Sequence, residues 1–185
     1  MIDTSDLLTE FPHGSQYKIC LLGEPLVGKT HLVSAITGRP FTHKPTAGAD
    51  ISHRKLQVSE DREITAIFWD LSGQPVFKKV RRIFYEGSHA LVYAYDVTRP
   101  GTLAALTNWI KEIRSNIGHT PSFLVGNKID LKDERNVDWD LGQKFAKRMK
   151  AVDFFETSAV TKQNLSEIFK AAIREAIRYR GHLSE

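Results

Sequence analysis

The chain has 185 residues, of which 41% are hydrophobic and 26% are charged, and its formal net charge is +4. A chain of this length and composition suits one globular domain with a full core, and it is not typical of a disordered or fibrous protein. The single cysteine excludes a disulfide framework within the chain, and no apolar run is long enough to cross a bilayer.

Residues 1–15 are polar and mixed, and we expect a flexible N-terminal arm there. From Tyr17 onward, strand-like and helix-like segments alternate. We predict strands at about 17–22, 48–58, 63–70, 90–97, 122–126 and 153–156, and helices at about 29–37, 76–85, 101–116, 138–149 and 164–179. The charged turn at 59–62 predicts a hairpin. The whole pattern predicts an α/β fold, in which a six-stranded, mostly parallel sheet has one antiparallel edge strand and helices on both faces.

Ligands of such sheets bind at the carboxyl ends of the strands. Residues 23–30, Gly-Glu-Pro-Leu-Val-Gly-Lys-Thr, follow the first predicted strand and fit the phosphate-loop pattern. Lys29 would bring a positive charge to the outer phosphates, and the hydroxyl of Thr30 would ligate Mg²⁺. The alternative is a plain glycine turn, which the flanking strand and helix disfavour. The backbone N–H groups expected to cradle phosphate oxygens are those of Leu26, Val27, Gly28, Lys29, Thr30 and His31.

A second motif, Asp70-Leu71-Ser72-Gly73-Gln74, ends the third predicted strand. The carboxylate of Asp70 can hold Mg²⁺, usually through water. Gly73 lets a backbone N–H approach the terminal phosphate, and Gln74 can orient an attacking water as the catalytic residue. The alternative is a strand-end turn that Asp70 caps.

Two more motifs follow the last two predicted strands, and together they predict a guanine site. In Asn127-Lys128-Ile129-Asp130, Asp130 can accept from the ring N–H and the exocyclic amine of guanine, a donor pair that adenine lacks. Asn127 can brace the loop, and the stem of Lys128 can lie on the base. In Glu156-Thr157-Ser158-Ala159, Ser158 can brace Asp130, and the Ala159 amide can reach the guanine carbonyl oxygen. The alternative for the first of these motifs is an Asn/Asp turn.

These four ordered motifs resemble those of a small GTPase of the Ras superfamily, and the closest resemblance is to the Rab branch. Residues 69–74 resemble the family's Trp-Asp-Thr-Ala-Gly-Gln, and 46–50 resemble its Thr-Ile-Gly-Val-Asp. The resemblance covers nearly all of residues 16–180, which implies a P-loop NTPase G domain over that range and a short tail at 181–185. It also implies that Thr46 reaches Mg²⁺ and the γ-phosphate when GTP is bound. Phe41 would pack edgewise on the guanine, unless it is plugged into the core.

The chain departs from the family in three places. Pro25 and Leu26 replace small residues in the phosphate loop, and we hypothesise that Pro25 crowds the space for an activator's arginine. The segment from Phe41 to Thr46 is shorter than in the family, and it carries His43, which we expect to face solvent. Pro75 follows Gln74, where it restricts Gln74 to extended backbone geometry.

The resemblance implies a Mg²⁺-dependent switch that binds GTP or GDP, hydrolyses GTP slowly, and acts in signalling or membrane traffic. Effectors, exchange factors and activating proteins would bind the switch regions. An alternative is a nucleotide-locked interaction module with negligible hydrolysis; an ATP-dependent P-loop kinase is disfavoured by Asp130 and by the lack of an arginine-rich lid. We expect a cytoplasmic protein whose basic last helix allows weak peripheral membrane contact. No lipid anchor is visible in this sequence, so either a lipidated tail has been trimmed or the protein lacks one. Nucleic acid is not an expected partner, because no recognition motif accompanies the mild positive charge.

Overall fold

The structure is a computed structural model that describes residues 15–42, 44–59 and 62–182. The predicted arm up to residue 14, His43, the tip of the predicted hairpin turn and the last three residues fall outside these ranges. Among the described residues, no helix combines the length and the apolar character that a membrane span needs.

Six strands form one sheet, whose order is β2-β3-β1-β4-β5-β6. The strands are β1 (Gln16–Leu22), β2 (Ala49–Ser59), β3 (Arg62–Leu71), β4 (Ala90–Asp96), β5 (Ser122–Asn127) and β6 (Asp153–Thr157). Only the β2–β3 pair is antiparallel, and every other neighbouring pair is parallel. The predicted sheet, with its antiparallel edge strand, is therefore confirmed.

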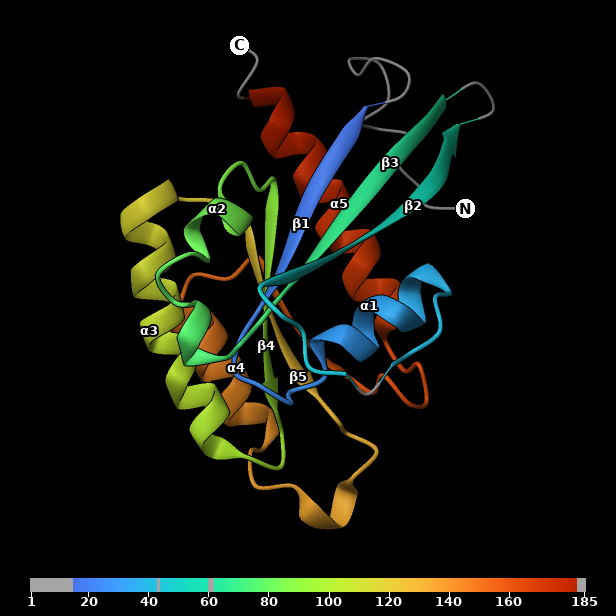
Figure 1. Ribbon diagram of the computed structural model, residues 1–185. Coiled ribbons are helices and arrows are strands. Elements are labelled where there is room, and N and C mark those ends of the chain that lie inside the picture. The colour runs from blue at the N-terminus through green and yellow to red at the C-terminus, as the bar shows by residue number, and fades with distance from the viewer. Residues whose placement is uncertain (1–14, 43, 60–61, 183–185) are drawn as a thin grey trace.

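Helices cover both faces of the sheet, as Figure 1 shows. The α-helices are α1 (Lys29–Thr37), α2 (Arg82–Tyr85), α3 (Pro100–Ile117), α4 (Trp139–Arg148) and α5 (Leu165–His182), and the two short 3₁₀ turns are η2 (Pro75–Phe77) and η3 (Lys132–Glu134). Helices α1 and α5 pack on one face, and α2, α3 and α4 pack on the other.

Each face of the sheet has its own apolar core, because successive side chains of a strand point to opposite faces. In β1, Ile19 and Leu21 pack under α1 and α5, while Cys20 and Leu22 pack under the other layer. All seven residues of β4 are buried, as expected for a central strand that is covered on both sides. Cys20 is fully buried and forms no disulfide, and it packs in this core as a small hydrophobic residue.

The predicted helix at 76–85 is the clearest departure from expectation. The segment is divided into the 3₁₀ turn η2 and the short helix α2, and only Arg81 and Tyr85 have buried side chains within it. Val76 and Ile83 are 76% and 65% exposed. A segment with so little apolar contact lacks the packing that stabilises a continuous helix, and Pro75 begins a tight turn at its start.

Candidate functional site

The phosphate loop links the end of β1 to the start of α1, at the carboxyl edge of the sheet. Two of its glycines are required by close contacts. A Cβ at Gly23 would lie 2.2 Å from the carbonyl oxygen of Ala94, and one at Gly28 would lie 2.3 Å from Nδ2 of Asn127. Leu26 adopts a positive φ of 64° with its side chain 80% exposed, so the loop accommodates leucine by pointing it into solvent.

Lys29 stands at the centre of this loop. Its side chain is 6% exposed, and its Nζ donates to the carbonyl oxygens of Gly23 and Glu24 at 2.9 and 2.8 Å. Burial lowers the pKa of Lys29 from 10.5 to about 8, although the nearby Asp70 partly opposes the shift. Among the described residues, the buried ammonium group therefore donates to backbone carbonyls and to no carboxylate, and its charge would favour an anion beside it.

Three oxygen atoms from three distant segments converge beside this loop. Oγ1 of Thr30 donates to Oδ2 of Asp70 at 2.5 Å, and Oγ1 of Thr46 donates to the same oxygen at 3.1 Å. The two hydroxyl oxygens are 3.2 Å apart. Oδ1 of Asp70 is buried without a hydrogen-bond partner, and burial raises the pKa of this carboxyl.

This donor set fits Mg²⁺, which prefers oxygen ligands and usually combines one or two protein carboxylates with waters and substrate phosphates. Thr30, Thr46 and Asp70 supply two hydroxyls and one carboxylate, and the unpaired Oδ1 of Asp70 leaves further acceptor capacity. Within the described residues, no group of three or more His, Cys, Asp and Glu side chains could hold a metal.

Gly73 lies directly against the phosphate loop. A Cβ there would come within 2.4 Å of backbone atoms of Glu24 and Pro25. Gln74 has φ −67° and ψ 134°, so the extended geometry expected before Pro75 is confirmed. The backbone N–H of Gln74 faces Oγ of Ser72 at 3.3 Å. The motif thus meets the loop through backbone at Gly73 and through a carboxylate at Asp70.

Asn127 joins the predicted base site to the phosphate loop. Its Nδ2 donates to the carbonyl oxygen of Val27 at 2.9 Å, across 100 positions of sequence. Its Oδ1 accepts from Oγ1 of Thr157 at 3.2 Å and from the backbone N–H of Ala159 at 3.3 Å. Through these three hydrogen bonds, Asn127 at the end of β5 joins the phosphate loop after β1 to the end of β6 and the loop that follows it.

Asp130 lies in the same cluster of loops, and its Oδ1 is buried without a hydrogen-bond partner. Lys128 has a positive φ of 72°, and its Nζ forms an ion pair with Oδ2 of Asp96 at 2.7 Å. Oγ of Ser158 accepts from the backbone N–H of Thr161 at 3.0 Å. The structure thus gives Ser158 a turn-stabilising contact, and among the described residues it records no hydrogen bond between Ser158 and Asp130.

Phe41 is neither plugged into the core nor isolated. It is 38% exposed, and its ring stacks on His31 with centroids 4.4 Å apart and planes inclined by 20°. This aromatic pair joins α1 to the segment between α1 and β2, which also carries Thr46. The alternative that placed Phe41 in the core is wrong.

Asp96 is a site residue to which sequence reasoning assigned no role. It accepts from Nζ of Lys128, from the backbone and hydroxyl of Thr98, and from Nε of Arg99 at 2.9 Å. Burial opposes ionisation of Asp96, but these hydrogen bonds together hold its pKa below the usual value. Nη2 of Arg99 also donates to the carbonyl oxygen of Pro25 at 3.2 Å, so this network reaches the phosphate loop. The sequence did offer one signal for this residue, because Asp96 is the single charged residue of β4 and stands at its end.

A second unpredicted connection joins the loop to the segment after Gln74. Nε1 of Trp109 donates to Oε1 of Glu24 at 2.9 Å, and the guanidinium of Arg81 lies 3.9 Å from the centroid of a Trp109 ring. Nε of Arg81 is 3.6 Å from Oε1 of Glu112. Trp109 is 3% exposed in α3, and nothing local in the sequence reveals these contacts.

Comparison with known proteins gives a consistent result. The family model described as "Ras family" matches residues 18–178. The chain is 34% identical over 165 residues to Ras-related protein RABA2a of Arabidopsis thaliana, an alignment that covers 88% of this chain and 75% of the relative. It is 32% identical over 166 residues to Ras-related protein RabC of Dictyostelium discoideum, covering 86% and 83% of the two chains. Ras-related protein Rab-7b of Paramecium octaurelia is 32% identical over 167 residues, with coverage of 86% and 81%. The chain therefore belongs to the Ras family, and it is a Rab-like small GTPase, a GTP-binding switch that hydrolyses GTP to GDP and phosphate.

Proposed function

We propose that Asp130 reads the guanine base and that Lys29 binds the phosphates of the same nucleotide. Asp130 has a buried, unpaired carboxylate oxygen, and Lys29 has a buried ammonium group with only carbonyl partners. A guanine would supply two N–H donors to the first, and a triphosphate would supply anionic oxygens to the second. Asn127 connects the two loops, so one nucleotide can satisfy both groups at once. The Ala159 amide, the stem of Lys128 on the face of the base, and Phe41 packed edgewise on it would complete the proposed base site.

Thr30, Thr46 and Asp70 would hold Mg²⁺ in this proposal, with Asp70 acting through water. When bound, the ion would neutralise charge on the phosphate oxygens. The chain's own contribution is to bring two hydroxyls and one carboxylate together from α1, the segment before β2, and the end of β3. Because Thr46 comes from the segment between α1 and β2, its contact makes that segment sensitive to what lies beside the phosphate loop.

Gln74 is the proposed catalytic residue, which would orient a water for in-line attack on the γ-phosphate. Gly73 and Thr46 would be the two points at which the γ-phosphate holds the switch segments. Loss of that phosphate would then release both segments, since the interactions that favour the GTP-bound arrangement would be gone. The backbone N–H groups of 26–31 would surround the phosphates and would not change between the two states.

The switch segments are the proposed contact surface for an effector, an exchange factor and an activating protein. Val76, Val80 and Ile83 are exposed apolar side chains on the segment after Gln74, and Ile51 is 48% exposed on β2. Exposed apolar side chains gathered on a segment that changes with the nucleotide are suited to state-dependent recognition. The proposed location is the cytoplasm, where peripheral membrane contact and a role in membrane traffic or signalling remain part of the proposal.

The observation that carries the proposal is the convergence of the Thr30, Thr46 and Asp70 oxygens beside the buried Lys29. Thr30→Val removes one hydroxyl and keeps the side-chain shape, so Mg²⁺-dependent GTP binding should weaken by about tenfold or more in calorimetry. Thr37→Val, on the same helix, is the matched control, because its hydroxyl bonds only to the carbonyl oxygen of Val33. Equal GTP affinities for the two variants would contradict the proposed metal site.

A further inference from the structure

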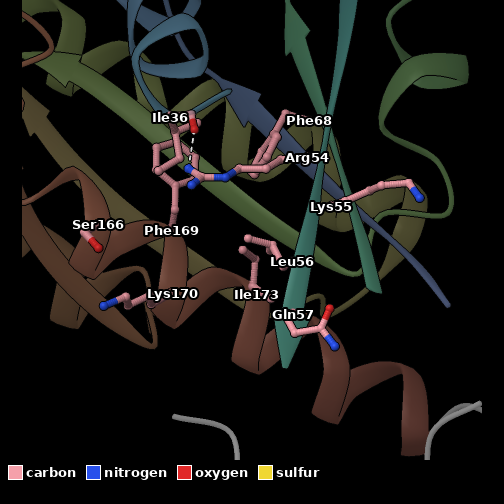
Figure 2. Close-up of a pocket in the computed structure, with 10 residues that line it drawn as sticks. All are labelled: Ile36, Arg54, Lys55, Leu56, Gln57, Phe68, Ser166, Phe169, Lys170 and Ile173. Atoms are coloured by element: carbon pink, nitrogen blue, oxygen red, sulfur yellow. Dashed lines mark hydrogen bonds between the residues drawn. The ribbon is translucent and has the colours of Figure 1, made fainter. Parts of the chain in front are cut away.

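A groove lies between the end of α1, the edge strand β2 and helix α5, apart from the nucleotide site (Figure 2). Its volume is about 530 Å³. Phe68, Phe169 and Ile173 form a buried apolar floor, and the partly buried Leu56 extends it toward the sheet edge. Figure 2 shows these side chains reaching the groove from β2, β3 and α5.

The rim of this groove is basic. Arg54 extends from β2 toward α1, where its Nη1 donates to the carbonyl oxygen of Ile36 at 2.5 Å, and Lys170 stands on the α5 side. Neither cation has a carboxylate partner among the residues that the structure describes. Lys55 differs, since Glu63 neutralises it at 2.8 Å. The groove therefore suits an occupant that is apolar on one side and acidic on the other.

The first fourteen residues of this chain have that chemistry. Their sequence contains Asp3, Asp6 and Glu10 and no Lys or Arg. The same stretch contains Leu7, Leu8 and Phe11. On a helical period, the three acidic positions would share one side and the three apolar positions would share the adjoining side. The segment is thus complementary to the groove in both charge and polarity.

The groove is also within reach of this segment. The backbone carbonyl of Ser15 accepts from the N–H of Thr65 at 2.9 Å, and Thr65 pairs with Lys55 on β2. Neighbouring strands are about 4.8 Å apart, so Ser15 starts about 10 Å from the β2 side of the groove. Fourteen residues span about 46 Å when extended and about 21 Å as a helix. Either length exceeds the distance that must be covered.

We propose that residues 1–14 bind in this groove of their own chain, with Leu7, Leu8 and Phe11 on its floor and the acidic side chains toward Arg54 and Lys170. This inference goes beyond the proposed nucleotide function. The bound segment would tie α5 to the end of α1 and to β2. Those two elements flank the segment that carries Thr46, so occupancy of the groove would restrain that segment from outside the nucleotide site.

A nitroxide spin label on the variant Ser5→Cys tests the proposal in the full-length, nucleotide-loaded chain. Cys20 is fully buried and will not compete for the label. The amide resonances of Leu56, Phe169 and Ile173 should lose most of their intensity, whereas those of α4 on the opposite face should keep theirs. The triple change Asp3→Lys, Asp6→Lys and Glu10→Lys should restore the lost signals. These changes lie outside residues 18–178, which the family model matches, so failure of that domain to fold would not explain the result.

Matched surface changes separate the groove from general charge effects. Arg54→Glu with Lys170→Glu should also restore the signals, whereas Lys144→Glu with Lys147→Glu on α4 should leave the broadening in place. Unchanged groove resonances in the labelled protein would overturn the proposal. A mixture of spin-labelled chains without ¹⁵N and ¹⁵N chains without the label tests for contact between copies. Broadening of the groove resonances in that mixture would identify a second copy as the occupant and would overturn the proposal. Binding to phosphatidylserine vesicles that requires Arg54 and Lys170 and survives deletion of residues 1–13 would identify a lipid surface, and would equally overturn it.

Discussion

At the base end of the site, side chains are locked by several buried hydrogen bonds, whereas at the switch end the chain meets the phosphate loop through one carboxylate and one glycine. Asn127 is 1% exposed and makes three hydrogen bonds to two other loops. The segment after Gln74, by contrast, exposes Val76, Val80 and Ile83 and holds two short helical pieces. This difference in packing fits the two tasks proposed for these ends, which are reading the base and sensing the γ-phosphate. Selecting a base requires partners that do not move, and sensing a phosphate requires a segment that can change.

The largest expected effect is a loss of GTP affinity when the base end of the site is changed. Asp130→Asn removes the charged acceptor of two proposed guanine hydrogen bonds, each worth about 1.5–3 kcal/mol when one partner is charged. GTP affinity should therefore fall about 100-fold or more in titration calorimetry. A xanthine nucleotide carries a carbonyl in place of the amine and should bind the variant better than GTP does. Asp133→Asn, in the neighbouring exposed 3₁₀ turn, is the control and should bind GTP normally.

Gln74→Leu tests the mobile end without disturbing the base end. If Gln74 orients the attacking water, single-turnover phosphate release should slow by about 10- to 100-fold, while GTP affinity stays within a factor of about two. Rapid quenching and chromatography of the nucleotide would measure this. The Rab-like relatives do not favour the alternative of a nucleotide-locked module without hydrolysis. That alternative would nonetheless be supported if the parent chain released no phosphate and Gln74→Leu changed nothing.

The pH dependence of nucleotide affinity tests the role of Lys29, which lies in the phosphate loop that both ends of the site contact. With its pKa lowered to about 8 by burial, Lys29 is mostly charged at pH 7 and mostly neutral at pH 9 in the free protein. A bound triphosphate favours the charged form, so GTP affinity should fall about tenfold between these pH values. Lys29→Met should bind weakly with no such slope. An equally steep slope in that variant would assign the titration to another group.

The same shift has the opposite sign for the stability of the nucleotide-free protein. Because the folded pKa lies below the unfolded value of 10.5, the unfolded state binds more protons between about pH 8 and 10.5. The free energy of unfolding contributed by Lys29 should therefore rise with pH across that window. Urea titrations of the free protein at pH 8 and 10, compared with those of Lys29→Met, would measure this contribution.

The smallest expected effect concerns the hydrogen bond between Trp109 of α3 and Glu24 of the phosphate loop. Trp109→Phe keeps a ring under Arg81 but removes the N–H that donates to Glu24. The free energy of unfolding should fall by about 1 kcal/mol in urea titrations of the GDP-bound protein. Trp139→Phe is a matched control, because Trp139 is 44% exposed and its ring packs on that of Phe154, with centroids 4.6 Å apart. An equal loss in both variants would show that the Glu24 contact contributes nothing particular.

Much of the fold could be predicted because its elements carry local patterns. The apolar run of β4 and the helical spacing in α3 are readable from neighbouring residues alone. The four motifs were found because each follows a predicted strand, and parallel strands end at a common edge. The start of α4 is equally local, because the carboxylate of Asp138 caps the helix by accepting from the N–H of Leu141.

What could not be predicted depends on contacts between distant residues. The break between η2 and α2 follows from the lack of packing around Val76 and Ile83, which a helical spacing does not reveal. The Glu24–Trp109 hydrogen bond joins residues 85 positions apart, and the Arg99–Pro25 contact joins residues 74 positions apart. Neither pair has a local pattern, because a lone tryptophan or arginine on a helix satisfies the amphipathic rule wherever its polar atoms point.

The tight fit of Gly73 against Glu24 and Pro25 has a practical consequence for experiments on the proposed γ-phosphate contact. Any side chain at this position must push two backbones apart, so an alanine scan would report steric damage whether or not the amide ever touches a phosphate. Replacing the residue with glycolic acid by chemical ligation exchanges only the N–H for an ester oxygen. That atomic edit leaves the surface unchanged, and it is therefore the version of the experiment whose result can be interpreted.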